Sequence, residues 1–460
     1  MEFNTEELRP IAEKFAQVIQ EGLREQPAPS IREIETGMRQ WLQRLGQLTL
    51  GLVLSQAEGR TPHSLACECG GRRQYQRRRP AHVLSVFGQV SYERSYYAGC
   101  DCGQGKAPLD ERFGLAPGQV TAGLAALVAL AGVELAFEHS GRWLEQFLLF
   151  AVSENTVRKE TELFGQLHAE QESRQKKASH DPAYLQARLR EEHQPPLRLY
   201  GSLDGAHVRI EERCRDPQTT SAAEKWREMK VGCWYTVAVV PRSWQRLRHR
   251  RKAAIGHQAL QAKEMHYFCE IAEADDFAAL LWASGLQAQA DRAPEVVFVC
   301  DGAQWIWRMV DHYYPQAVQI VDWFHAEERL HNLARDVLDP DTAPHWLETM
   351  RSALWHGDLP TVIAACEMLA TRSPAAAQAV TYFRNNAERM QYERFRTHGY
   401  MIGSGTVESG CKQIVTQRLK RSGAQWHVPG ANQTAKARAA WLSGHWSNLC
   451  AQRDALPLAV

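Results

Sequence analysis

Apolar residues recur at helical spacing near the start of the chain. A helix that begins at about Ile31 is predicted by the apolar positions Ile34, Met38, Trp41, Leu42, Leu45 and Leu48. Together with the preceding residues, this pattern predicts two helices in an N-terminal helical segment, residues 1–58. The simpler interpretation is a helical hairpin that packs on its neighbour, and the alternative is a dimerisation arm.

The pattern changes to strand-like runs in the middle of the chain. A polar stretch, residues 171–196, is predicted as a linker between domains, either a solvated helix or a connector. After it, residues 197–210, 230–240 and 264–272 read as successive strands. The segments "DDFAALLWASGLQ", "EVVFVCDG", "AQWIWRMVDHYY" and "AVQIVDWFH" then alternate helix, buried strand, helix, and a strand that runs into a helix.

Three consecutive strands followed by alternating helices and strands is the order of an RNase H-like core, a mixed sheet with helices on both faces. We therefore predict a multidomain α/β plus α protein. Its catalytic core would comprise residues 197–335 and the final helices in residues 401–450. Residues 336–400 show helical patterns throughout and would form an all-α insertion.

Length and composition narrow the class of protein. With 460 residues, the chain exceeds what one hydrophobic core serves, so several units are expected. Apolar content of 44% and charged content of 23% are those of a soluble globular protein, and no run of 18 apolar residues predicts a membrane span. The acidic start "MEFNTEELRP" contains no apolar signal segment, so we expect a cytoplasmic protein in a reducing setting.

The net charge of +1 hides two basic segments. Residues 242–252 carry six Lys and Arg and no acid, and these include Arg248, Arg250 and Arg251. Residues 395–450 carry seven Lys and Arg, with Glu408 as the only acid. Such segments suit a polyanion as partner, although a charge run is also a common solvated face.

Three carboxylates are candidates for catalysis. Asp204 lies in the first predicted strand of the core, Asp301 ends the strand "VVFVCD", and Glu408 lies in "IGSGTVESG" at a helix start. Each Asp is followed by Gly, so a plain turn is the alternative interpretation. Together the three match an RNase H-like layout that holds two Mg²⁺ or Mn²⁺ ions about 3.5–4 Å apart.

The helix that carries Glu408 brings basic side chains to the predicted site. Lys412 lies on the same face as Glu408, where an intrahelical ion pair is the alternative role, while Val415 and Leu419 would dock the helix on the sheet. Thr406 is the predicted N-cap. The residues predicted to contact a phosphate backbone are Lys412, Arg418, Lys420 and Arg421.

Four cysteines form two pairs within residues 59–114. Cys67, Cys69, Cys100 and Cys102 flank a predicted β-hairpin, so a zinc-ribbon-like unit with one structural Zn²⁺ is expected. Both pairs are C-x-C rather than C-x-x-C, so unligated thiols are the alternative. The residues predicted to contact DNA beside them are Arg72, Arg73, Arg77, Arg78 and Arg79. The other cysteines among the eleven are scattered, and the odd total does not suit a disulfide framework.

Residues 115–170 have the outline of a helix-turn-helix. Ser153 is the predicted N-cap of a second helix, Glu154 to Phe164, whose first turns would present Asn155, Arg158 and Lys159 to double-stranded DNA. An ordinary helical hairpin has the same outline.

Several quoted segments resemble one family. "SLDGAHVRI", "VCDGAQWIW", "VDWFHAEERL" and "RMQYERFRTHGYMIGSGTVESGCKQIVTQRLKRSGAQW" are similar to bacterial insertion-sequence DDE transposases of the ISKra group, near the Mutator-like transposases. The resemblance covers residues from about 60 to 448. It implies Asp204, Asp301 and Glu408 as the catalytic triad, and Asp322 with His325 as an Asp-x-x-His element.

The resemblance also implies an activity and partners. We expect binding of the terminal inverted repeats of an insertion sequence, followed by metal-dependent strand cleavage and strand transfer into target DNA, in a homodimer or larger synaptic assembly. His325 would orient DNA or a carboxylate, or merely cap its helix. Two rivals are a nuclease or resolvase on the same core that cuts without joining, and a transposase-derived DNA-binding regulator.

Overall fold

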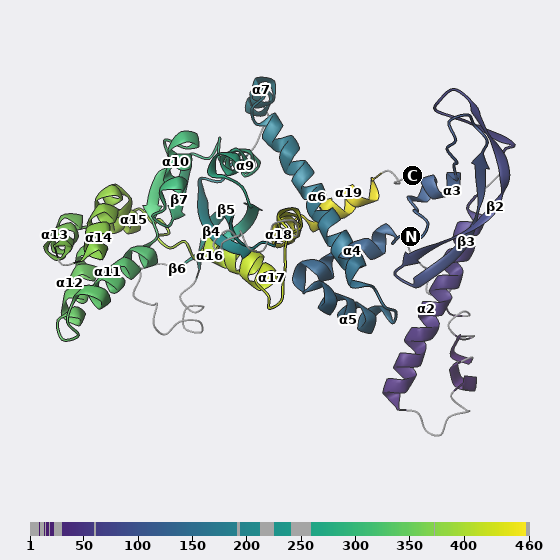
Figure 1. The fold of residues 1–460 in the computed structure, drawn as a ribbon, viewed down its shortest axis with the longest axis horizontal. Coiled ribbons are helices and arrows are strands. Elements are labelled where there is room, and N and C mark those ends of the chain that lie inside the picture. Colours follow the sequence, from purple (N-terminus) through teal and green to yellow (C-terminus); the bar gives the residue numbers. More distant parts are fainter. Residues whose placement is uncertain are drawn as a thin grey trace, which may run out of the picture. The chain divides into compact units, whose positions relative to one another are not determined.

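The computed structural model describes residues 9, 13, 15–17, 19–22, 30–58, 61–190, 194–211, 225–240, 259–371 and 373–456. The chain forms two compact units (Figure 1). The first comprises Met1–Gly132, Phe137–Glu160 and Cys450–Val460, and the second comprises Val133–Ala136 and Thr161–Leu449. Each unit is described by itself below.

The first unit begins with the long helix α2 (Ile31–Gln56) and a three-stranded antiparallel sheet. Ser30 and Glu33 cap α2 reciprocally in a capping box, so the predicted helix is confirmed. The strands are β1 (Ser64–Ala66), β2 (Arg72–Ser85) and β3 (Gly88–Ala98), and the short helix α3 (Pro108–Phe113) follows. Buried side chains of α2, β2, β3 and α3 form one apolar core, with Leu54, Val83, Val90 and Leu109 among them.

Three helices complete the first unit: α4 (Ala122–Glu134), α5 (Phe137–Leu148) and the start of α6 (Glu154–Ala178). Leu124, Val128, Leu144, Val152 and Val157 bury their side chains together between them. This core holds α5 against α6, as a helix-turn-helix or a helical hairpin both require.

The predicted linker, residues 171–196, is largely helical. Helix α6 continues past Phe164 to Ala178, and α7 spans Pro182–Arg190. The polar residues of α6 were interpreted as solvated, but Glu172 is buried at 5% exposure because it forms an ion pair with Lys436. The two compact units divide within α6, after Glu160.

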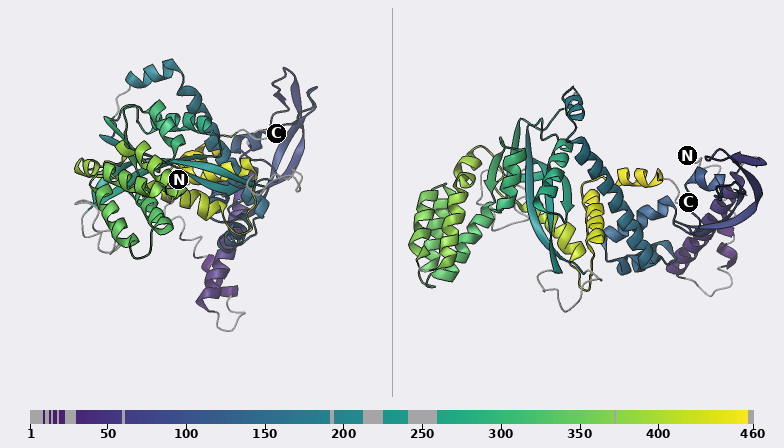
Figure 2. Two further views of the ribbon diagram at one scale, coloured as in Figure 1. Left: turned by 60° about the vertical axis from the view of Figure 1, so that its left-hand side comes forward. Right: turned by 45° about the horizontal axis from the view of Figure 1, so that its top comes forward.

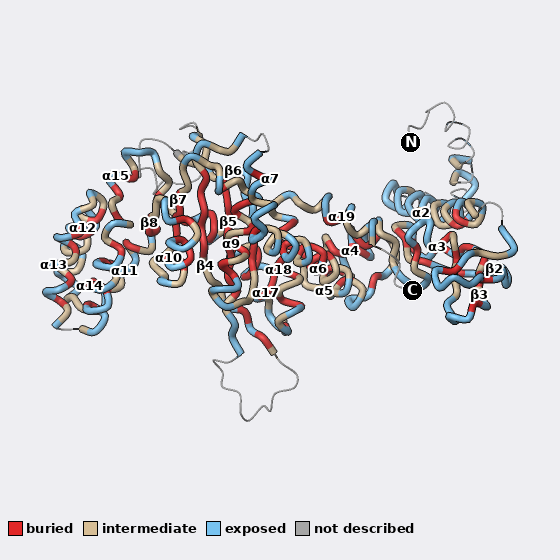
Figure 3. The backbone as a smooth tube through the Cα atoms, turned by 90° about the horizontal axis from the view of Figure 1, so that it is seen from above, coloured by how far each residue is buried: buried red, intermediate tan, exposed pale blue. Residues whose placement is uncertain are grey.

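The second unit is built on a five-stranded mixed sheet with the strand order β6-β5-β4-β7-β8. Its strands are β4 (Arg198–Arg209), β5 (Trp226–Val240), β6 (Ala259–Glu270), β7 (Glu295–Cys300) and β8 (Val318–Val321). The first three pair antiparallel, and β7 and β8 add parallel to β4. The middle of this sheet is buried (Figure 3), and the predicted mixed sheet, with three consecutive strands followed by alternating helices and strands, is confirmed.

Helices cover both faces of this sheet (Figure 2). Consecutive residues of β6 point to opposite faces. Phe268 stacks on Phe277 of α9 (Ala274–Gln287), while Tyr267 lies against Gly410 of α16 (Gly405–Cys411). The remaining helices of the core are α10 (Gln304–Tyr313), α11 (Trp323–Val337), the π-helical turn η4 (Lys412–Thr416), α17 (Gln417–Leu419) and α18 (Val428–Leu442). The last helix, α19 (Trp446–Asp454), starts in the second unit, and its residues from Cys450 onward belong to the first.

A block of helices lies between α11 and α16. It contains α12 (Ala343–Trp355), α13 (Leu359–Ala370), α14 (Pro374–Asn385), η3 (Ala387–Met390) and α15 (Tyr392–Thr397), and the described residues of this block contain no strand. Trp323 joins it to the core through edge-to-face contacts with Trp355 and Tyr392. None of the helices in the described part of the chain is long and apolar enough to cross a membrane.

Candidate functional site

The parallel strands β4 and β7 bring Asp204 and Asp301 to neighbouring positions. Their register pairs Gly201 with Phe298, and each aspartate lies three residues further along its strand direction. The amide of Leu203 donates to the Cys300 sulfur at 3.3 Å, which ties the two strands together just before the aspartates. The sequence placed Asp204 within the first strand and Asp301 at the end of another, and the register explains why they meet.

The surroundings of Asp301 disfavour the ionised form of its carboxyl group. Burial raises the pKa of Asp301, and the nearby Asp204 carboxylate raises it further. The amide of Ala303 donates to Asp301 at 3.0 Å and opposes this shift, as do the positive charges of His325 and Arg329. The balance leaves the pKa above its ordinary value, so a cation beside the two aspartates would be stabilising.

Helix α16 packs against β4 and β5 and carries Glu408 in its first turn. The Cys411 thiol of α16 hydrogen-bonds to Asp204, and burial together with this carboxylate raises the pKa of Cys411. The Ser404 hydroxyl donates to Glu408 at 3.1 Å. The predicted cap is wrong: the helix begins at Gly405 with Ser404 as N-cap, and Thr406 is buried inside the first turn.

The tightest cluster near Glu408 contains Asp322 and His325. One ligand atom from each of Asp322, His325 and Glu408 lies within 4.8 Å of the others. Asp204 and Asp301 are outside this group, so the structure gathers the predicted triad less closely than it gathers Glu408 with the Asp-x-x-His element.

Asp322 is fully buried and fixes the imidazole of His325. It accepts hydrogen bonds from the backbone amide of His325 at 2.8 Å and from its Nδ1 at 3.1 Å, and also from the Ser404 amide. Burial opposes ionisation of Asp322, but these hydrogen bonds hold its pKa below the ordinary value. The hydrogen bond to Asp322 is the largest cause that raises the pKa of His325 to about 9, with contributions from Asp301 and Glu408. His325 is therefore protonated near neutral pH. Its Nδ1 lies 4.0 Å from Oε1 of Glu408.

The donor chemistry of these residues fits a hard divalent cation. Asp204, Asp301 and Glu408 supply carboxylate oxygens from two strands and one helix, and such oxygens are the preferred ligands of Mg²⁺ and Mn²⁺. Burial, and to a smaller extent the Asp204 carboxylate, raises the pKa of Asp301, and a bound cation would offset both effects.

Two residues near Asp301, Tyr382 and Arg329, were not predicted from the sequence. Tyr382 of α14 lies over Gly302, where a Cβ atom would fall 2.1 Å from the Tyr382 ring. Arg329 of α11 lies 5.0 Å from the centroid of the same ring. Arg329 follows His325 by one helical turn, so helical spacing could have found it, whereas nothing in the sequence linked the helical block to the site.

The basic residues that follow Glu408 divide into exposed and buried ones. Val415 and Leu419 are buried, which confirms their predicted docking role, and Lys412 and Lys420 are exposed. Within the described residues no ion pair joins Lys412 to Glu408. Arg421 is partly buried and donates to the Gln417 and Glu134 carbonyl oxygens.

The prediction that Arg418 contacts phosphate is wrong for this structure, because its side chain is only 2% exposed. The π-helical turn η4 inserts an extra residue before α17 and rotates the turn that follows. Arg418 thereby points inward, 5.1 Å from the Trp426 ring centroid, and burial lowers its pKa to about 9.

The four paired cysteines of the first unit form a second cluster. Cys69 lies 3.3 Å from Cys67 and 3.2 Å from Cys100, and Cys67 lies 3.5 Å from Cys102, measured between sulfurs. A hydrogen bond from the backbone of Gly71 lowers the pKa of Cys69, which favours the thiolate. Because four sulfurs within 4.8 Å suit tetrahedral ligation, this cluster can bind a zinc ion.

Glycines let the chain turn closely around the sulfurs. Gly70 and Gly103 adopt positive φ, 86° and 72°, in the turns that follow the two pairs. A Cβ atom on Gly71 would fall 2.7 Å from the Cys100 sulfur. The short C-x-C spacing is thus compatible with a cluster because a glycine follows each pair.

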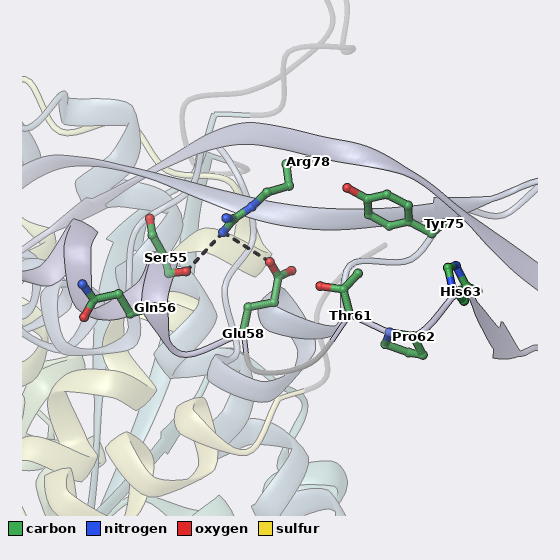
Figure 4. Close-up of a pocket in the computed structure, with 8 residues that line it drawn as sticks. All are labelled: Ser55, Gln56, Glu58, Thr61, Pro62, His63, Tyr75 and Arg78. Carbon is green, nitrogen blue, oxygen red and sulfur yellow. Dashed lines mark hydrogen bonds and ion pairs between the residues drawn. The ribbon is translucent and has the colours of Figure 1, made fainter.

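The five arginines of β2 differ in their surroundings. Arg72 is exposed and donates to Ser64, and Arg77 is exposed. Arg78 donates to the Ser55 carbonyl oxygen and pairs with Glu58 at 3.4 Å, in the wall of a pocket lined by residues of α2, of the segment before β1, and of β2 (Figure 4). Arg79 stacks on Tyr96, with its guanidinium carbon 3.6 Å from the ring centroid.

Arg73 does not fit its predicted contact with DNA. Its side chain is 5% exposed and donates to the Gln104 carbonyl oxygen at 3.0 Å, because alternate residues of a strand point to opposite faces and Arg73 faces inward.

The start of α6 agrees with the expected recognition helix in its local geometry. The Ser153 hydroxyl accepts from the Thr156 amide at 3.1 Å, so the predicted N-cap is confirmed. Asn155 and Lys159 are exposed, and Arg158 donates to the Asn155 side chain at 2.8 Å. Arg248, Arg250 and Arg251 lie outside the described residues.

No family model matches this chain, and a search of curated proteins finds no match. The functional proposal therefore stands on the residues and their geometry.

Proposed function

We propose that this chain is a DDE transposase, which cleaves DNA at the ends of an insertion sequence and joins those ends to a target. One observation carries the proposal: Asp204 and Asp301 are neighbours on the parallel strands β4 and β7, and α16 brings Glu408 to the same sheet. The strand order β6-β5-β4-β7-β8 is that of an RNase H-like sheet. This is the layout in which such enzymes gather carboxylates for phosphoryl transfer.

Asp204, Asp301 and Glu408 would hold the divalent ions. When bound, two such ions activate the attacking oxygen and stabilise the leaving oxygen of an in-line displacement at phosphorus. Water is the first nucleophile and the freed 3′-hydroxyl the second, at the same site. No covalent protein intermediate is required.

His325 is a positioning residue in this proposal. The carboxylate of Asp322 fixes one ring nitrogen, and the pKa of about 9 keeps the ring positively charged at neutral pH. A protonated imidazole donates from both nitrogens, so the second N–H is available to a phosphate oxygen of the DNA. Arg329 adds positive charge near Asp301, and the exposed Lys412 follows Glu408 by four residues.

The first unit would read the terminal repeats. The cysteine cluster with exposed Arg72 and Arg77 suits contacts to the DNA backbone, and Asn155 and Lys159 at the start of α6 suit contacts in the major groove. Zinc would hold the cluster together as a structural ion.

A joining assay tests the proposal. The substrate is DNA from the inverted repeats that flank the gene, pre-cut to expose 3′-hydroxyl ends, with a supercoiled target plasmid and Mg²⁺. We expect joined product from the wild type and its loss by about 1,000-fold in Asp204→Asn. Asp336→Asn, an exposed aspartate on α11 that pairs with Arg335, is the matched control and should join normally.

The assay also separates the rivals. Cleavage of uncut ends without any joined product would assign the chain as a nuclease or resolvase. Tight binding of the ends with neither cleavage nor joining would assign it as a DNA-binding regulator. Normal joining by Asp204→Asn would reject the proposed site.

A further inference from the structure

Helix α2 carries an apolar seam with the spacing of a coiled coil. The seam consists of Ile31, Ile34, Met38, Trp41, Leu45, Leu48 and Leu52. These residues are separated alternately by three and four positions, which places them at the a and d positions of three successive heptads. Because the spacing averages 3.5 rather than 3.6 residues, it favours a left-handed pair of helices over a helix that lies on a globular surface.

The opposite side of α2 is already occupied by its own unit. The Gln43 side chain donates to the Val86 and Leu148 carbonyl oxygens at 3.1 and 3.0 Å. A Cβ atom on Gly46 would fall 2.3 Å from the Phe87 ring, and one on Gly51 would fall 2.6 Å from the Ser91 carbonyl oxygen. These close approaches fix the rotation of α2 about its axis and direct the seam away from the unit.

Six of the seven seam residues are exposed, and Ile34 is partly buried. Ile31 is 70% exposed, Trp41 51%, Leu48 55% and Leu52 60%, and Figure 3 colours much of α2 as exposed. Phe15 contacts Trp41 edge to face, with ring centroids 6.5 Å apart, and still leaves half of Trp41 exposed. A continuous apolar surface of this length marks a site of protein interaction.

We propose that α2 is a dimerisation helix whose seam pairs with the seam of a second copy of this chain. A heptad seam without charged side chains is self-complementary, so the same residues serve both copies about a two-fold axis. Covering each exposed seam side chain removes on the order of 100 Å² from water, which brings two copies to about 1,200 Å², the size of a stable interface. The helix is preformed on its unit, so pairing costs little conformational entropy. The inference does not depend on the chemistry proposed for the second unit.

The test compares the mass of the full-length protein in solution with that of seam variants. Light scattering after size-exclusion chromatography at micromolar concentration should give a dimer for the wild type. The double variant Leu45→Glu, Leu48→Glu should raise the dissociation constant of the dimer by at least about 100-fold, because four charges would enter the interface. Circular dichroism and zinc content should remain unchanged, because both leucines are exposed on α2.

Two further variants keep the proposal open to refutation. Val53→Glu places the same charge on an exposed residue of α2 outside the seam and should leave the dimer intact. Deletion of residues 1–29, which retains the Ser30 cap, should also leave it intact. A monomeric wild type, or a chain that dimerises only after this deletion, would show that the seam is covered by the chain's own N-terminal residues and would overturn the proposal. An unchanged dimer in the double variant would overturn it as well.

Discussion

The two clusters of potential metal ligands are assembled in different ways. The four cysteines come from two turns joined by one hairpin, and glycines beside each pair let the sulfurs approach within 3.2–3.5 Å. The carboxylate site draws Asp204, Asp301, Asp322 and Glu408 from β4, β7, the start of α11 and α16. The positions of the cysteines, the local cluster, depend on two turns. The positions of the carboxylates, the dispersed site, depend on the packing of the whole sheet and its helices.

The largest expected effect concerns the dispersed site. Replacement Asp301→Asn should lower joining of pre-cut DNA ends by about 1,000-fold, because it removes an oxygen ligand and a charge beside Asp204. The thermal stability should not fall, since the substitution removes a buried charge whose burial, together with the Asp204 carboxylate, raises the pKa of Asp301. Scanning calorimetry and the joining assay check the two parts separately. A variant that loses activity only because it unfolds would contradict this account.

Loss of one cysteine from the four-cysteine cluster should affect the first unit and leave the second unchanged. Cys100→Ser should abolish binding of one zinc per chain, and hydrogen exchange should accelerate in β2 and β3, which flank the cluster. Exchange in β4 and β7 of the second unit should be unchanged. Cys366→Ser, a buried thiol of α13, is the control and should retain zinc. Equal zinc content in Cys100→Ser would refute the cluster as a zinc site.

The difference between the clusters also explains what could be predicted from the sequence. The cysteine pairs, the helix that begins at about Ile31 and the succession of strands and helices in the second unit follow from short-range patterns, so the sequence sufficed for them. Arg73 and Arg418 were misplaced because their burial depends on strand facing and on a π-helical turn. Tyr382 was missed because only the packing of α14 brings it to Asp301.

The packing of Tyr382 offers a sharper test of the dispersed site. Gly302→Ala should lower the free energy of unfolding by about 1–3 kcal/mol, because its Cβ would overlap the Tyr382 ring. Removal of the ring in a Gly302→Ala, Tyr382→Ala double variant should cancel most of this loss relative to Tyr382→Ala alone. Gly405→Ala is the control, since a Cβ there meets open space. Additive effects in the double variant, measured by denaturant unfolding, would contradict the packing described here.

The smallest expected effect is a pH dependence of stability. Asp322 raises the pKa of His325 in the folded protein to about 9, above its unfolded value of about 6.5. The stabilising contribution is therefore fully present below pH 6.5 and is lost as the pH rises through 9. Because His325 is 38% exposed, solvent screening limits the effect to about 1 kcal/mol. Metal-free wild type should lose this stability between pH 6.5 and 9, and His325→Ala should not. If the free energies of unfolding of the two proteins changed in parallel with pH, the ion pair between His325 and Asp322 would contribute nothing to stability.

The central claim is that Glu408, carried by α16, completes a metal-dependent site with Asp204 and Asp301. The joining of pre-cut terminal DNA in Mg²⁺ by Glu408→Gln tests it most directly, because this substitution keeps the size of the side chain and the bond from Ser404 while it removes the charge. The account predicts joined product from the wild type and a loss of about 1,000-fold from the variant, with DNA binding retained. Joined product at the wild-type level from Glu408→Gln would contradict it.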